Sequence, residues 1–193
     1  LTAIGVVAPM TCGFFFCFVY FNSYLVTSLA LSSAQALLVT SMGLILSLVA
    51  TLASGNIADR IGYKPVLFRT SQLLLVATFP LVIAMSGHWD LHFTLGAYFL
   101  LCLILGAYCS TAFASVTALF PTPIRYSGIS ISVNLASPIF GSTAPLLVAA
   151  SVGALGNDVG FMAFGGYFTL LWVMALVAIH QINPNAFDRW GQR

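Results

Sequence analysis

Charged side chains are scarce in this sequence of 193 residues, which has six Lys and Arg residues and four Asp and Glu residues. Together they make up 5% of the chain, whereas soluble globular domains carry about 25%. So few charges exclude a water-exposed globular surface, and so few cations exclude a nucleic-acid-binding surface. Because 60% of the residues are hydrophobic, we predict that lipid surrounds most of the protein.

Sequence patterns for catalysis, metal binding and cofactor binding are also missing. The chain has four cysteines, which are Cys12, Cys17, Cys102 and Cys109. They lie inside apolar runs at spacings that match no zinc motif, and the sequence has no phosphate-cradling loop. A six-helix intramembrane serine protease would need a G-x-S-G-like nucleophile and a membrane-embedded His. The nearest stretch, "FGSTAP", lacks that pattern, and His88 and His92 lie in a link between apolar runs. We therefore predict no enzyme activity, no catalytic residue, no metal and no cofactor.

Long apolar runs take up most of the chain. A helix needs about 20 apolar residues to cross a bilayer, and Gly, Pro, Asn and charged residues divide the sequence into six runs of that kind. The predicted spans are approximately 3–28, 35–54, 66–86, 93–118, 127–152 and 160–182. The runs are too long for barrel strands and lack their strict alternation. We predict an all-α membrane protein with one transmembrane domain over 1–183 and a cytoplasmic tail over 184–193.

Basic residues cluster on one side of the predicted membrane domain. They lie near the links after the second, fourth and sixth spans, as Arg60, Lys64, Arg69, Arg125, Arg189 and Arg193. An even number of crossings separates these places, so they share one side, while the opposite links contain no Lys or Arg. By the positive-inside rule the basic side is cytoplasmic. We predict a multi-pass protein of the cell inner membrane with both termini in the cytoplasm.

The stretch "GNIADRIGYKP" (55–65) holds three of the ten charged side chains within six positions. A solvated turn would explain Arg60 and Lys64, but not Asp59 or the flanking glycines. Glycine allows a tight turn and a close approach of two helices. A carboxylate at the end of a membrane helix is well placed to meet the positive N-terminus of a neighbouring helix. We therefore predict a charged network at the cytoplasmic mouth.

This stretch resembles the signature loop of the major facilitator superfamily, which joins the second and third helices of each six-helix half. The matching positions are Gly55, Ala58, Asp59, Arg60, Gly62 and Lys64. Tyr63 departs from the pattern, because the family usually has a second basic residue there. The resemblance implies a cytoplasmic gate formed by Gly55, Asp59, Arg60, Gly62 and Lys64, with the region of Arg125 meeting the equivalent loop of the other half.

A second stretch, "LFPTPIRYSGISISVNLASPIFGSTAPLL" (119–147), resembles the metabolite:proton symporters of that superfamily, the group of proline/betaine, shikimate and α-ketoglutarate transporters. The matching positions are Phe120, Pro121, Thr122, Arg125, Tyr126, Gly128, Asn134, Leu135, Ala136, Phe140, Gly141, Thr143 and Pro145. Val133 and Ser142 depart from the usual tyrosine and glycine. The resemblance implies the C-terminal half of a twelve-helix carrier, in which two inverted three-helix repeats form each half and the substrate binds near the midplane.

Uncharged polar side chains inside the spans are the candidates for substrate contact, namely Tyr20, Tyr24, Tyr108 and Asn134. A phenol or an amide costs less to bury than a charge and can still bind a carboxylate or an ammonium group. Two alternatives stay open, since Tyr24 suits an aromatic belt and Asn134 suits a bond to a neighbouring helix. No Asp, Glu, Lys or Arg lies deep in a predicted span, so the proton-coupling carboxylates are expected in the other half.

The sequence therefore predicts proton-coupled transport of a small zwitterion or organic acid by alternating access. The expected partners are the substrate, protons, the lipid bilayer, and either a separate N-terminal six-helix half or a second copy of the chain; nucleic acid is not expected. The alternative is a transport-inactive remnant or structural membrane protein derived from a split carrier.

Overall fold

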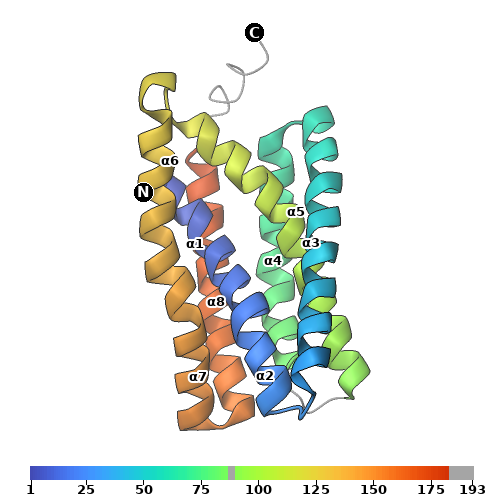
Figure 1. Cartoon of the computed structure of the whole chain (residues 1–193). Helices are drawn as coiled ribbons and strands as arrows, with labels where there is room; N and C mark the ends of the chain where they lie inside the picture. Colours follow the sequence, from blue (N-terminus) through green and yellow to red (C-terminus); the bar gives the residue numbers. More distant parts are fainter. Residues whose placement is uncertain (87–89, 183–193) are drawn as a thin grey trace.

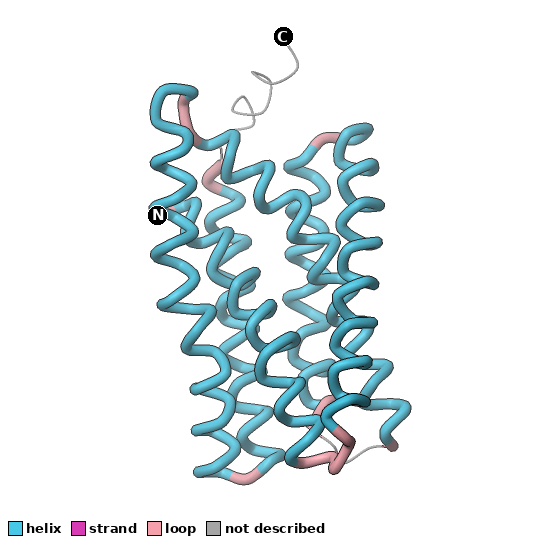
Figure 2. Tube along the Cα trace, viewed as in Figure 1, coloured by secondary structure: helices cyan, strands magenta, loops and turns pink. Residues whose placement is uncertain are grey.

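The computed structural model describes residues 1–86 and 90–182, and this part of the chain is almost entirely helical without strands (Figure 2). Its elements are α1 (Thr2–Phe15), the π-helix η1 (Phe16–Tyr20), α2 (Phe21–Thr27), α3 (Ser33–Ile61), α4 (Tyr63–Ala84), α5 (Leu91–Leu119), the short 3-10 helix η2 (Thr122–Ile124), α6 (Arg125–Ala136), the π-helix η3 (Ser137–Ser142), α7 (Thr143–Leu155) and α8 (Asn157–His180).

These elements join into six helices that are long and apolar enough to cross a membrane, counted over the described ranges. They are Thr2–Thr27, Ser33–Ile61, Tyr63–Ala84, Leu91–Leu119, Thr122–Leu155 and Asn157–His180. The predicted all-α class with six spans, consistent with one half of a major facilitator fold, is confirmed. The predicted tail at 184–193, with Arg189 and Arg193, lies outside the described residues, as does His88.

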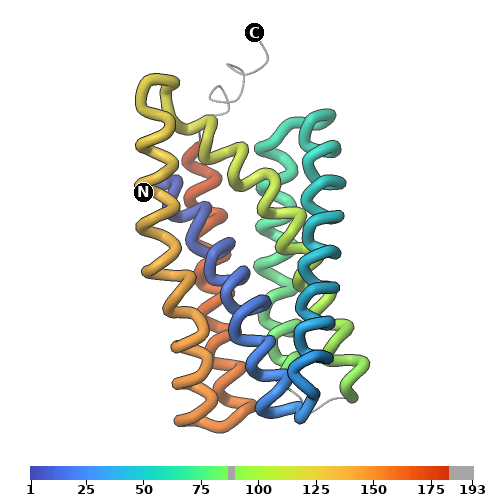
Figure 3. Tube along the Cα trace, viewed as in Figure 1, coloured from blue at the N-terminus to red at the C-terminus, as the bar shows by residue number. Residues whose placement is uncertain are grey.

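The spans form two layers. In Figure 1 the helices α1 and α3, the upper part of α5 and the α6–η3–α7 segment face the viewer, and α4 and α8 lie behind them. Figure 3 follows the same course along the chain. The helix pairs with the most extensive contact are α3 with α5, α4 with α8 and α4 with α5.

Small residues and hydroxyl groups bring α3 against α5. The Ser47, Thr51 and Ser54 hydroxyls donate to the Cys102, Gly106 and Ala107 carbonyl oxygens at 2.8, 2.8 and 2.6 Å. Lipid tails are as apolar as the side chains, so close packing and interhelical hydrogen bonds drive such contacts. This seam fixes the spacing of the two helices beside the pocket described below.

Two spans contain π-helical turns. In the fifth span, Pro138 lies in η3, where its missing N–H interrupts the α-helical ladder. A Cβ atom at Gly141 would lie 2.9 Å from the Phe15 ring and 3.2 Å from Thr11, so the glycine lets η3 approach α1. Single π-turns in α-helices often mark functional sites.

The charged stretch at 55–65 is mostly helix rather than loop. Helix α3 continues seven residues past the predicted end of its span, and Gly62 alone links it to α4. Gly62 has φ +94°, a conformation that glycine adopts without strain. A Cβ atom at Gly55 would lie 3.2 Å from the Ser110 hydroxyl of α5. The two glycines thus serve different purposes, a turn at Gly62 and a close approach at Gly55.

Candidate functional site

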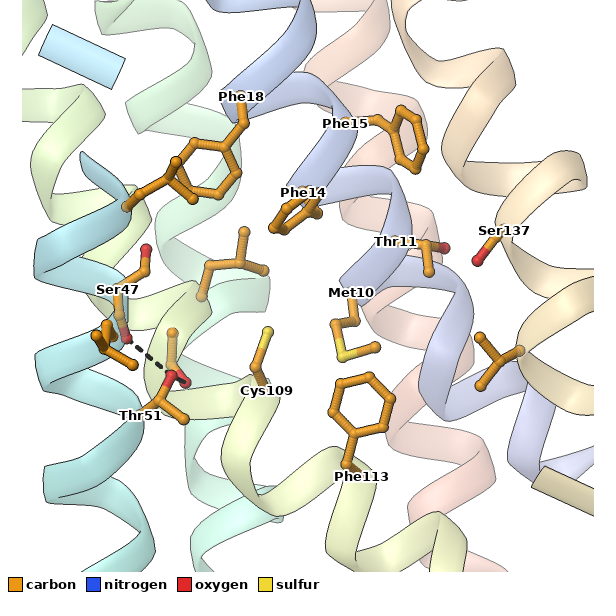
Figure 4. Close-up of a pocket in the computed structure, with 15 residues that line it drawn as sticks. Met10, Thr11, Phe14, Phe15, Phe18, Ser47, Thr51, Cys109, Phe113 and Ser137 are labelled. Atoms are coloured by element: carbon orange, nitrogen blue, oxygen red, sulfur yellow. Dashed lines mark hydrogen bonds between the residues drawn. The ribbon is translucent and has the colours of Figure 1, made fainter. Parts of the chain in front are cut away.

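A cavity of about 420 Å³ lies in the front layer, between α1, α3, α5 and the start of η3 (Figure 4). The residues at the midpoints of the four spans that enclose it are close to Phe15, Ser47, Leu105 and Ser137, and all four line the cavity. The cavity therefore lies at the middle of the bundle's length, where a membrane carrier binds its substrate.

Four aromatic rings line the cavity. Phe14, Phe15 and Phe18 come from the first span and Phe113 from α5 (Figure 4). The Phe14 and Phe18 rings meet edge to face with their centroids 4.9 Å apart. Phe14 and Phe113 are 46% and 48% exposed, so their rings are free to contact a ligand or a second protein unit.

The polar atoms of the wall are hydroxyls and one thiol. The Thr11 hydroxyl donates to the Ala8 carbonyl at 2.9 Å, and Ser47 and Thr51 donate to α5 as described above. Ser137 from η3 and Cys109 from α5 complete the polar lining. No charged side chain lines the cavity among the residues that the structure describes.

The tyrosines predicted to bind substrate pack away from this cavity. Tyr108 is fully buried, donates to the Val6 carbonyl at 2.8 Å and meets Trp172 edge to face. Tyr20 and Tyr24 stack on each other with centroids 6.1 Å apart and pack against Phe161 of α8. The Tyr24 hydroxyl donates to the Ser86 carbonyl at 2.6 Å. In this conformation these phenols hold the first span against α5 and α8.

The two asparagines also lie outside the cavity wall. Asn134 is exposed on α6, and its amide donates to the Ser130 hydroxyl at 3.3 Å within the same helix. The Asn22 amide donates to the Thr40 hydroxyl of α3 at 3.1 Å. Asn22 thus faces α3 while Tyr20 and Tyr24 face α8, the divergence that their helical spacing predicts.

Asp59, at the predicted cytoplasmic gate, accepts a hydrogen bond from the Tyr63 hydroxyl, which bridges the end of α3 and the start of α4. Asp59 and Arg60 are both exposed, and no ion pair joins them within the described chain. Tyr63, the departure from the family pattern, therefore supplies the partner of the carboxylate. Arg125 donates from Nε to the Phe120 carbonyl at 3.3 Å.

Lys64 ties the same turn to the last span, because its Nζ donates to the Ile182 carbonyl at 2.5 Å, just beyond α8. A cation is favourable beside the carbonyl groups that end a helix.

Replacing Lys64 with Met should therefore lower the free energy of unfolding by about 1 kcal/mol. Thermal unfolding of the purified protein in detergent measures this loss. Arg60→Met is the matched control, because Arg60 is exposed at the end of α3, and it should change the unfolding temperature little. Equal effects of the two variants would contradict a specific bond from Lys64.

Charges are sorted to the two ends of the bundle. The α3–α4 turn and the start of α6 lie at the upper end in Figure 1, and this end carries Arg60, Lys64 and Arg125. The lower end carries Asp90 before α5 and Asp158 at the start of α8. The basic links thus share one end in the described structure.

Sequence reasoning missed the residues of the cavity wall. Their signal is pairs of residues four positions apart, which share one helix face: Phe14 with Phe18, Ser47 with Thr51, and Cys109 with Phe113. A phenylalanine within an apolar span is normally interpreted as a contact with lipid. The pairs therefore indicate a cavity only once the three helices are known to lie side by side.

No family model matches the chain. Among curated proteins it is similar to a citrate-proton symporter from Salmonella typhi, with 32% identity over 153 residues, which are 78% of this chain and 35% of that protein. It is 28% identical over 177 residues to an ectoine/proline transporter from Corynebacterium glutamicum, covering 92% of this chain and 35% of the relative. An alpha-ketoglutarate permease from Escherichia coli is 24% identical over 177 residues, again 92% of this chain and 40% of the relative. The chain thus spans between about a third and two fifths of the length of these relatives.

Proposed function

The chain belongs to the metabolite:proton symporters of the major facilitator superfamily, and on this basis we propose that it forms the C-terminal half of a proton-coupled carrier. The carrier moves a small polar metabolite across the inner membrane by alternating access. The observation that supports this most strongly is the uncharged cavity at the middle of four spans, on the face away from α4 and α8. Symport and membrane insertion agree with the named relatives, which are transporters rather than enzymes.

We assign the substrate to the front layer, where Asn134 lies on α6 beside the cavity. The role of the three tyrosines in this conformation is indirect. Their hydroxyl bonds and ring contacts hold the first span in position, and they are Tyr20, Tyr24 and Tyr108. Each remains open to direct contact with substrate in the other conformations of the carrier.

The second half is required for two reasons. No Asp, Glu, Lys or Arg lies deep in a described span, and Arg69 near the start of α4 comes closest. Proton coupling in membrane carriers usually relies on such groups, so the other half supplies them. The gate residues Gly55, Asp59, Arg60, Gly62, Lys64 and Arg125 would likewise meet that half, or a second copy of this chain.

The proposed topology places the basic end in the cytoplasm. Arg60, Lys64 and Arg125 at one end and Asp90 and Asp158 at the other follow the positive-inside rule. Both chain termini would then be cytoplasmic.

Reconstitution into proteoliposomes tests the proposal. The chain alone should give no saturable uptake. In a chimera, the chain replaces the matching region of the Salmonella typhi citrate-proton symporter. This chimera should take up its substrate, and a proton gradient should raise the rate of that uptake at least tenfold. Proteoliposomes prepared without the chimera are the control for leakage. Robust saturable uptake by the chain alone would overturn the half-carrier proposal, and an inactive but correctly inserted chimera would favour a transport-inactive remnant.

A further inference from the structure

From the chemistry of the cavity wall we infer that this half binds the alkylammonium end of the substrate, so that the substrate is a zwitterion or an organic cation rather than a polycarboxylate. The inference rests on the proposed function, because it assigns the cavity to a transported ligand. The inference chooses between two classes of substrate, polycarboxylates and zwitterions. The relatives leave this choice open, since one is a citrate-proton symporter and another is an ectoine/proline transporter.

The rings supply the first part of the argument. Phe14, Phe18 and Phe113 line the cavity, and about half of Phe14 and of Phe113 is exposed (Figure 4). The face of an aromatic ring carries partial negative charge and attracts a cation placed within about 6 Å of its centre. An alkylammonium group also buries its methyl groups against the rings and Met10, which lines the same wall.

The hydroxyls supply the second part. A hydroxyl has one proton to donate and two lone pairs that accept. Thr11, Ser47 and Thr51 give their protons to backbone carbonyls, so these three oxygens offer a ligand only lone pairs. Along the described wall, Ser137 is the one hydroxyl without such a bond, and the Cys109 thiol is a weak donor.

The same wall is a poor site for an anion. A carboxylate that leaves water needs donated hydrogen bonds or a nearby cation to offset its lost hydration. The described wall offers one hydroxyl donor and no Lys, Arg or His, and ring faces and hydroxyl lone pairs repel negative charge. The carboxylate of a zwitterion would therefore lie toward the other half of the carrier.

Protection of Cys109 from N-ethylmaleimide tests the inference on the full chain in lipid nanodiscs. Cys109 lines the cavity and is partly exposed, whereas Cys12, Cys17 and Cys102 are fully buried. Cys109→Ser identifies the labelled position by abolishing the reaction. Choline should slow labelling at concentrations at least fivefold lower than those needed with dimethylbutanol, its neutral carbon isostere. Only choline carries a positive charge that the faces of the aromatic rings attract. Citrate should not protect.

Single-ring variants sharpen the test, because Phe→Leu removes the aromatic ring and keeps an apolar side chain at the same position. Phe14→Leu and Phe113→Leu should each weaken protection by choline about fivefold and leave that by dimethylbutanol within about twofold. Phe79→Leu is the control, because Phe79 is similarly exposed, at 41%, on α4 outside the cavity.

Equal protection by choline and dimethylbutanol, protection by citrate, or no protection by any of them would overturn the inference. These outcomes are separable from failure of the transport proposal. Choline protection without flux through the chimera would keep the binding site and remove transport. Citrate flux together with citrate protection would keep transport and remove the alkylammonium site.

Discussion

Gly106→Ala should lower the free energy of unfolding by about 3 kcal/mol, because among the glycines that the structure describes Gly106 has the least room for a Cβ atom. A Cβ atom at this position would lie 2.3 Å from the Ser47 carbonyl oxygen and 2.7 Å from the Ser47 Cα. Both contacts are with backbone, so no side-chain rotation relieves them. Helix α3 must move away from α5, and the bonds from Ser47, Thr51 and Ser54 lengthen together.

The measurement is thermal unfolding of the purified protein in detergent, where 3 kcal/mol corresponds to a shift of about 10 °C for a chain of this size. Gly96→Ala is the matched control in the same helix, since nothing lies within 4 Å of its added Cβ. Alanine favours helix over glycine by up to about 1 kcal/mol, so this control should hold or raise the unfolding temperature. A shift at Gly106 no larger than that at Gly96 would show that α3 and α5 are not in backbone contact.

The sequence sufficed for the fold class because the membrane simplifies the problem. Apolar runs of about 20 residues in lipid must be helices that satisfy their own backbone groups, and the two motif stretches carried the family, which the relatives confirm. The sequence did not show where α3 ends. Asp59 and Arg60 read as a water-exposed loop, but helix α3 continues through Gly55 and both charged residues and ends only before Gly62, where the backbone takes a positive φ.

The candidate site was harder to predict, because tyrosine in a membrane helix has two uses. The phenols of Tyr24 and Tyr108 reach backbone carbonyls at Ser86 and Val6, partners that are 62 and 102 residues away in the sequence. No local pattern reveals such a contact. The cavity at Phe14 has the same origin, since its wall combines short segments from four spans. The sequence predicted the depth of the site, near the middle of the spans, but it did not identify the residues that line it.

In the chimera that restores flux, Asp59→Asn should lower the uptake rate at least tenfold at unchanged protein level. Asp59 is exposed at the end of α3, where the helix carbonyls disfavour a carboxylate, and its bond from Tyr63 is a contact between neighbouring turns. Neither feature indicates that Asp59 contributes to the free energy of unfolding of this chain. A charge-assisted bond to a helix N-terminus of the other half would contribute about 1.5–3 kcal/mol to one conformation, which equals roughly a tenfold to hundredfold change in its population.

Two controls distinguish a bond from Asp59 to the other half from a local effect within the α3–α4 turn. Tyr63→Phe removes the bond within the chain but keeps the carboxylate, so it should change uptake by less than about threefold. Asp90→Asn makes the same chemical change at the opposite end of the bundle, before α5, and should leave uptake unchanged. If Tyr63→Phe reduced flux as strongly as Asp59→Asn, the carboxylate would be acting on its own helix turn. If Asp59→Asn left flux intact, the partner of this stretch would not be a second half at all.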